Sequence, residues 1–423
     1  MLVACSKPDP APAPARSTIV TASSSVVRHS SAPPAPTVGG AASARETEEP
    51  PEQRDDGNAS ARWIADEPVN IAPAGPATAS SRGVVMIDRK GQLLVAKLQR
   101  TPTGGEPAPT RVERLDAQRE RFFSYGVGPA VIGDDAFFVH GGKLHRRSIG
   151  ESGPDQVLAT DARNGTRVAA VSIAVGEKSV PVVAYIAQAG DHPVARLWIE
   201  GQPLRTLSPE GSAASSVALT THGRDLIAVA IEGRSGMSPV HARRIRIDQG
   251  APRLDEDQVV WVAGSSQSLT EVRAVGSDVD AWAFVAIEKD TTHFGLARIH
   301  VGTKPRTDSE ISWRDYPNGL DPAPVDTTTL CSEPTVLYAR PSEATPRAPQ
   351  ELHLAAITPK GLSPSQKVAF AGAFTNASIA PTEGGALVAY VGDGRTWALS
   401  VRCAPRAEAA TAASGERPRN LAR

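Results

Sequence analysis

The sequence predicts an all-β fold, a β-propeller of seven blades, from three observations. A short apolar strand, a polar turn and a second strand recur along the 423-residue chain. They recur about every 50 residues, which is typical of propeller blades. Glycine and proline are abundant, with 36 of each, and they supply the backbone angles that tight turns require.

The repeat is defined by one reference residue in each apolar strand. Neighbouring reference residues are 44 to 57 positions apart, the extremes being the steps from 182 to 226 and from 226 to 283. The seven reference residues are Val84, Ala136, Val182, Leu226, Ala283, Thr335 and Ala386. Such even spacing favours one ring of similar units over the alternative, two stacked β-sandwiches.

The two strands of each unit differ in pattern. The first is a continuous apolar run, as at 226–231 and 386–391, and such a run requires cover on both faces. Neighbouring blades give that cover to the middle strands of a propeller. The second strand often alternates, as at 243–248, which favours a position nearer the rim. We expect residues 62–66 to complete the last blade, because closing the ring removes exposed sheet edges.

Composition divides the rest of the chain. Residues 6–61 are rich in Pro, Ala, Ser and charged residues, and such a segment buries too little apolar surface to fold. We therefore predict a disordered tether at 6–61, the propeller at 62–404 and a disordered tail at 405–423. A flexible tether of this length has an end-to-end distance of about 40 Å.

A short motif lies at the amino terminus. Leu2, Val3, Ala4 and Cys5 resemble the lipobox of bacterial lipoproteins. The resemblance implies that residues 1–5 are the remnant of a signal, that Cys5 is lipidated, and that the protein is held at a membrane of the cell envelope. Because Ser6 rather than Asp follows the cysteine, it implies the outer membrane. The alternative is an ordinary disordered tail with an incidental cysteine.

The other two cysteines, Cys331 and Cys403, lie in the repeat region, and no Cys-x-x-Cys pair occurs. They are candidates for one disulfide if the protein leaves the cytoplasm. Two buried free thiols are the alternative, because the sequence does not give the distance between them.

Charge and motifs limit the function. The chain has 45 basic and 46 acidic residues, so we expect no nucleic-acid partner. Patterns typical of hydrolases, zinc proteases, P-loops and dinucleotide folds do not occur. We therefore predict no catalytic residue, no metal and no cofactor. The predicted function is a non-catalytic lipoprotein of the cell envelope. The alternatives are a hydrolase or lyase acting at the central channel of the propeller, and a purely structural envelope component.

Two connections between predicted strands are long for hairpins, at 232–241 and 340–350. Long loops on a rigid scaffold often carry recognition. In the first, Arg234, Met237 and His241 are the candidate contacts for a protein, a glycan or a small ligand. The second contains three prolines and is expected to be a stiff excursion.

Overall fold

A computed structural model of the protein describes residues 62–404 with the exception of 74, 76, 88–92, 101–109, 114–127, 150–154, 234–237, 249–250, 263–267, 278–280, 289–291, 300–310, 314–322, 344–347 and 359–360. The chain divides into two units, Met1–Asn58 and Ala59–Arg423, and all described residues belong to the second. The predicted signal remnant, tether and tail lie outside the described residues.

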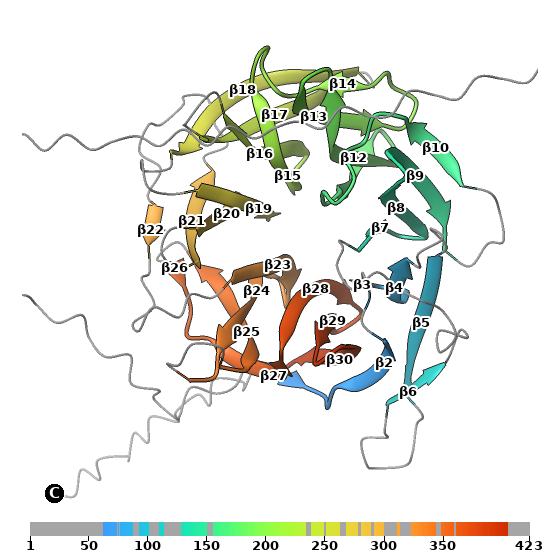
Figure 1. The fold of residues 1–423 in the computed structure, drawn as a ribbon, viewed down its shortest axis with the longest axis vertical. Coiled ribbons are helices and arrows are strands. Elements are labelled where there is room, and N and C mark those ends of the chain that lie inside the picture. Colours follow the sequence, from blue (N-terminus) through green and yellow to red (C-terminus); the bar gives the residue numbers. More distant parts are fainter. Residues whose placement is uncertain are drawn as a thin grey trace, which may run out of the picture. The chain divides into compact units, whose positions relative to one another are not determined.

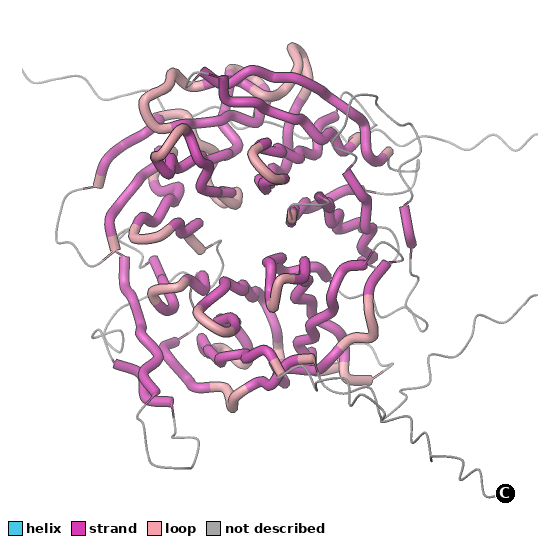
Figure 2. Tube along the Cα trace, turned by 180° about the vertical axis from the view of Figure 1, so that it is seen from behind, coloured by secondary structure: helices cyan, strands magenta, loops and turns pink. Residues whose placement is uncertain are grey.

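Seven antiparallel sheets surround one axis (Figure 1). The second unit is therefore a seven-bladed β-propeller, as the repeat predicts, and not a pair of stacked sandwiches. Strands and connecting loops make up the described part of the chain (Figure 2). Within it, no helix has the length and apolar character needed to cross a membrane.

Each blade starts with a strand next to the axis and continues outward in chain order. Blades 1 to 7 have the innermost strands β3 (Ala77–Ser80), β7 (Ala130–Ile132), β11 (Ala169–Val175), β15 (Ala213–His222), β19 (Ser268–Gly276), β23 (Ala323–Leu330) and β28 (Phe374–Thr382). The second strands are β4 (Gly83–Ile87), β8 (Asp135–His140), β12 (Lys178–Ala189), β16 (Asp225–Gly233), β20 (Ala281–Glu288), β24 (Glu333–Pro341) and β29 (Gly385–Gly392). All seven reference residues of the repeat lie in these second strands.

The outer half of each blade contains a third strand and, in most blades, one further strand. The third strands are β5 (Leu93–Arg100), β9 (Lys143–Ser148), β13 (His192–Ile199), β17 (Val240–Asp248), β21 (Thr292–Ile299), β25 (Gln350–Thr358) and β30 (Arg395–Cys403). The outermost strands of blades 1 to 6 are β6 (Thr110–Glu113), β10 (Gln156–Ala159), β14 (Arg205–Thr206), β18 (Ala251–Trp261), β22 (Ile311–Trp313) and, in blade 6, β26 (Gly361–Leu362) and β27 (Gln366–Gly372).

The ring is closed by the start of the described chain. In blade 7, β1 (Trp63–Ala65) and β2 (Val69–Pro73) both pair with β30, and Trp63 lies opposite Cys403. The prediction that residues 62–66 complete the last blade is confirmed. Trp63 is 1% exposed, and its backbone N–H and C=O are both hydrogen-bonded to the Gln366 amide of blade 6, at 3.2 and 2.5 Å. The closing strand is thus attached to two blades.

The hydrophobic core lies between the blades. Residues Val182 to Ala187 of β12 are all fully buried, which explains their continuous apolar run. Apolar residues of β12 and β16 belong to one cluster, and those of β24, β25 and β29 to another. The middle strands are therefore covered on both faces by their neighbours.

Cys331 and Cys403 form a disulfide, with their Cα atoms 5.8 Å apart. The bond joins the turn between β23 and β24 in blade 6 to the last residue of β30 in blade 7. Cys403 is also the partner of Trp63 in the closing strand. The disulfide therefore ties blade 6 to the end of the strand that pairs with the closing strand β1.

We expect loss of this disulfide to lower the free energy of unfolding by about 2–4 kcal/mol, because the cross-link restricts a long segment of the unfolded chain. Urea unfolding of the Cys331→Ser/Cys403→Ser variant measures the loss. Reductant should destabilise the wild-type protein and leave the variant unchanged. Equal stability of the two proteins under oxidising conditions contradicts the prediction.

A polar cluster around His353 lies on the outer strands of blade 6. The His353 ring stacks on Tyr338, and its Nε2 lies 3.3 Å from a Glu351 oxygen while its Nδ1 lies 3.4 Å from the Ser365 hydroxyl. Burial lowers the pKa of His353, despite the opposing effect of Glu351. Burial alone raises the pKa of Glu351, but Lys367 and His353 outweigh it, so this pKa lies below its ordinary value.

These shifts predict lower stability at acid pH. His353 binds a proton less readily in the folded protein than in the unfolded chain, where a histidine binds one near pH 6.5. Stability is therefore lost as pH falls below that value, and the Glu351 contribution is lost at still lower pH. Urea unfolding between about pH 5 and pH 7 should show the decline. The slope should be shallower in His353→Gln, and an unchanged slope contradicts this assignment.

Candidate functional site: the central channel

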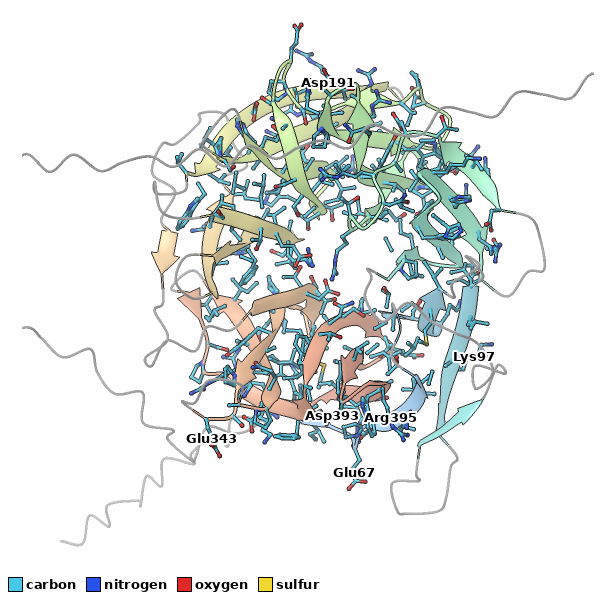
Figure 3. All side chains as sticks on the ribbon, in the orientation of Figure 1. Glu67, Lys97, Asp191, Glu343, Asp393 and Arg395 are labelled. Atoms are coloured by element: carbon cyan, nitrogen blue, oxygen red, sulfur yellow. A yellow bond between two sulfur atoms is a disulfide. The ribbon has the colours of Figure 1, made fainter. Side chains whose placement is uncertain are left out.

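The innermost strands and the residues just before them, from all seven blades, line a channel of about 460 Å³ along the axis. Most lining residues are small and apolar, or threonines. The charged lining residues are Arg167, Arg273 and Asp326. Side chains extend from the strands toward the central opening in Figure 3, while the labelled Lys97 and Asp191 point away from it at the rim. The channel is thus a mainly uncharged cavity with a small group of charges.

β-Bulges place the polar residues that surround Arg167. Four consecutive innermost strands, β15, β19, β23 and β28, contain a register shift near their start, directly followed by a polar residue. The four polar residues are Ser216, Glu271, Asp326 and Asn376. A bulge bends its strand and re-aims the neighbouring side chain. The last three of these side chains lie within 4.0 Å of the Arg167 guanidinium.

Arg167 lies just before β11, on a connection that is fixed at several points. The backbone N–H of Arg163 donates to the carbonyl of Ile186 at 2.8 Å, and the Thr166 hydroxyl donates to the Arg163 carbonyl at 2.7 Å. The side-chain oxygen of Asn164 accepts from the Gly142 N–H of blade 2 at 2.9 Å. These bonds hold the backbone from which the Arg167 side chain reaches the other blades.

The contacts of Arg167 are all long. Its Nε lies 3.6 Å from a Glu271 oxygen and its Nη1 lies 4.0 Å from an Asp326 oxygen. Its Nη2 donates to the Asn376 side-chain oxygen at 3.4 Å. The Nε atom is buried and has no hydrogen-bond partner among the described residues. Blades 5, 6 and 7 therefore surround this guanidinium without binding it tightly.

The neighbours of Arg167 have closer partners. Arg273 forms an ion pair with Glu271 and donates to the Val272 carbonyl at 2.9 Å. The two oxygens of Asp326 accept from the backbone N–H groups of Thr327 and Ile379, each at 3.0 Å. Since Ile379 belongs to blade 7, Asp326 also links two blades.

Burial and charge act together on these groups. Burial, and secondarily the positive charge of Arg273, lowers the pKa of the Arg167 guanidinium, which nevertheless stays protonated as arginines do in proteins. Burial raises the pKa of Glu271, but Arg273 and Arg167 outweigh it and hold this pKa below its ordinary value. Near neutral pH the group around Arg167 therefore contains ionised side chains of both signs.

None of the residues that the sequence predicts as ligand contacts or lipid anchor is among the described residues that line the channel. Cys5, Arg234 and Met237 lie outside the described residues. The prediction that His241 lies in a loop is wrong. The connection is shorter than the predicted 232–241, because β16 ends at Gly233 and β17 begins at Val240. The His241 ring lies 3.0 Å from an Asp257 oxygen within blade 4. Across the described ranges, no group of three or more His, Cys, Asp or Glu residues could hold a metal ion.

Sequence reasoning missed Arg167, Glu271, Asp326 and Asn376. Arg167 and Asn376 are 209 positions apart, and nothing local connects them. One signal was present: charged residues interrupt the apolar and threonine runs at 268–276 and 323–330. An alignment of the innermost strands would have placed these residues at the same end of the channel.

Comparisons with known proteins find only distant structural likenesses. No protein-family model matches the chain, and no curated protein matches it. The N-terminal domain of Nup159 is 11% identical with a TM-score of 0.46, covering 80% of this chain and 94% of that one. A fucose-specific lectin from Aleuria aurantia is 12% identical with a TM-score of 0.38, covering 64% and 92%. The Trypanosoma rangeli sialidase is 9% identical with a TM-score of 0.40, covering 81% and 59%.

Proposed function

We propose that this protein is a binding protein that holds a small organic ligand in its central channel. The supporting observation is the channel itself. Its volume of about 460 Å³ is within the range typical of ligand sites. An apolar wall with a few polar groups at defined positions is also typical of such sites.

The electrostatics support binding better than acid–base catalysis. A general acid or base works best with a pKa near the operating pH. The pKa of Glu271 is instead held below its ordinary value by two arginines, and Asp326 is engaged by two backbone N–H groups. Both carboxylates therefore have structural partners, and the hydrolase or lyase alternative receives less support.

A blocking variant tests the proposal. Ala170 lines the channel, so Ala170→Phe should fill part of it. Val157 is 44% exposed in β10, so Val157→Phe adds a similar ring at the rim. Small aromatic acids, amides and amines, monitored by ligand-observed NMR, should bind the wild type and Val157→Phe but not Ala170→Phe. No binding to the wild type, or binding unaffected by the block, overturns the proposal.

We further propose that the protein is a lipoprotein of the outer membrane, attached through Cys5. The pattern of Leu2 to Cys5 supports the anchor. The Cys331–Cys403 disulfide supports an oxidising compartment, because structural disulfides persist outside the cytoplasm. From the sequence we also propose that a protein or glycan binds at the predicted loop 232–241.

Fractionation of cells that express the gene with its native upstream region tests the anchor. The wild type should be found with the membranes and take up a labelled fatty acid. Cys5→Ser should be released and unlabelled, while Cys331→Ser/Cys403→Ser should stay with the membranes. A Cys5→Ser protein that remains in the membrane fraction contradicts the anchor.

A further inference from the structure

We propose that Arg167 binds the carboxylate of the channel's ligand, which makes that ligand a monoanionic carboxylic acid with a small body. This inference rests on the proposed function, and it adds the class of ligand and the residue that recognises it. It comes from the incomplete pairing of Arg167, together with its place at the channel.

Arg167 differs from the other ion-paired arginines that the structure describes. Each of those lies within 3.3 Å of a carboxylate oxygen, as Arg243 and Arg244 do at 2.5 Å. Among the described residues, the carboxylate oxygen nearest to Arg167 lies 3.6 Å away, although the Arg167 side chain is only 21% exposed. An arginine has five N–H donors, and the described residues accept one hydrogen bond from this one, of 3.4 Å. A largely buried cation whose N–H donors lack acceptors lowers the stability of the fold. Its presence therefore calls for another explanation.

The surrounding fold does not depend on Arg167. Glu271 is already paired with Arg273, and Asp326 is already bonded to the backbone of its own blade and of blade 7. Removing the Arg167 guanidinium therefore leaves both carboxylates with their closer partners, and takes from the Asn376 side-chain oxygen one hydrogen bond of 3.4 Å. The presence of Arg167 is better explained by ligand recognition than by a contribution to stability, because binding sites are often kept at the expense of stability.

Charge and shape indicate the class of ligand. Arg167 and Arg273 carry two positive charges, and Glu271 and Asp326 carry two negative charges, so the group is neutral before a ligand binds. One added negative charge gives Arg167 a partner. Any anion there also faces the carboxylates that lie 3.6 and 4.0 Å from Arg167, and a dianion is repelled by them more strongly than a monoanion. A carboxylate is planar and accepts two parallel N–H bonds from a guanidinium. Arginine pairs with phosphate in the same way, so it is the lower charge of a carboxylate that favours it over a dianionic phosphate.

The body of the ligand follows from the wall. Threonines Thr327, Thr328 and Thr329 line the channel on β23, and alanine and valine side chains line it on β11. The hydroxyls of Thr327 and Thr329 donate to backbone carbonyls of blade 5, so methyl groups and hydroxyl lone pairs remain for contact. A short apolar or weakly polar body fits these surroundings.

The stability of the unliganded protein gives the first test. Arg167→Met should have a melting temperature equal to or above that of the wild type, because it removes an incompletely paired cation. Arg273→Met is the matched control and should be less stable, because Arg273 is 6% exposed and its loss takes from Glu271 its close ion-pair partner. If Arg167→Met is destabilised as much as Arg273→Met, Arg167 is a structural residue and the inference is overturned.

Binding gives the second test, with benzoate, benzamide and phenyl phosphate as probes measured by calorimetry. Benzoate and benzamide have nearly the same shape and differ in charge. The wild type should bind benzoate at least about tenfold more tightly than benzamide, as a charge-assisted pair requires. This preference should disappear in Arg167→Met and persist in Arg246→Met, whose arginine is 44% exposed in blade 4.

The outcomes separate the inference from the proposed function. If benzoate and benzamide bind equally well and Ala170→Phe abolishes both, the channel is still the binding site. The role of Arg167 is then overturned. Tighter binding of phenyl phosphate than of benzoate overturns the carboxylate class. If no probe binds and Ala170→Phe has no effect on any fragment, the proposed function fails and the inference fails with it.

Discussion

Replacing Trp63 by alanine is expected to lower the free energy of unfolding by about 3–5 kcal/mol, the usual cost of truncating a buried tryptophan. Trp63 is 1% exposed and belongs to the cluster that joins blades 6 and 7. Its strand is short, with three residues, and pairs only with β30 among the described strands. The side chain therefore provides much of the attachment of β1, so the loss should extend to the pairing itself.

Urea unfolding measured by tryptophan fluorescence and by circular dichroism tests this expectation. The neighbouring Ile64 is 40% exposed, so Ile64→Ala is the matched control and should change stability by less than about 1 kcal/mol. Compared with the wild type, Trp63→Ala should show faster hydrogen exchange in β30, and a smaller change in β12 on the opposite side of the ring. A loss below that of the Ile64 control contradicts the role given to β1.

Removing the Arg243 guanidinium should cost about 3–5 kcal/mol, because it leaves a buried carboxylate without its counter-charge. Arg243 and Glu232 are each 1% exposed and form a two-armed pair at 3.0 and 2.5 Å. Glu232 also accepts from the Ser208 hydroxyl at 2.8 Å, and Asp257 lies 3.3 Å from Arg243. Arg243→Met therefore disrupts a network that spans blades 3 and 4.

A double variant separates the pair from its burial. Arg243→Met/Glu232→Leu removes both charges and should recover most of the loss, since apolar replacements of a buried pair are often neutral. Arg246→Met at the rim is the control, with an expected change of no more than about 1 kcal/mol. If the double variant is as unstable as Arg243→Met alone, side-chain packing rather than unpaired charge explains the loss.

The fold was predictable because its signal is local. The continuous apolar runs at 182–187 and 226–231 identify strands covered on both faces, and both lie in second strands of their blades. Their spacing along the chain then gives the number of blades. The prediction of the closing strand also succeeded, because residues 62–66 precede the first complete repeat and the last repeat lacked a strand.

The channel group was not predictable by the same means. Arg167 meets Glu271, Asp326 and Asn376 only because the ring brings blades 3, 5, 6 and 7 to one axis. Single charged residues within a strand have no local pattern that distinguishes a channel position from a solvated face. His241 shows the opposite error: the sequence predicts it at the end of the loop 232–241, whereas β17 already includes it.

The closed ring also affects how the chain folds during synthesis. Trp63 pairs with Cys403, so an early-made strand has to wait until almost the whole propeller has left the ribosome. Contacts this distant in sequence slow folding, and the apolar side chain of Trp63 lacks its final cover for that time. Nascent chains that pause before residue 395 should therefore be the species that most need protection by chaperones.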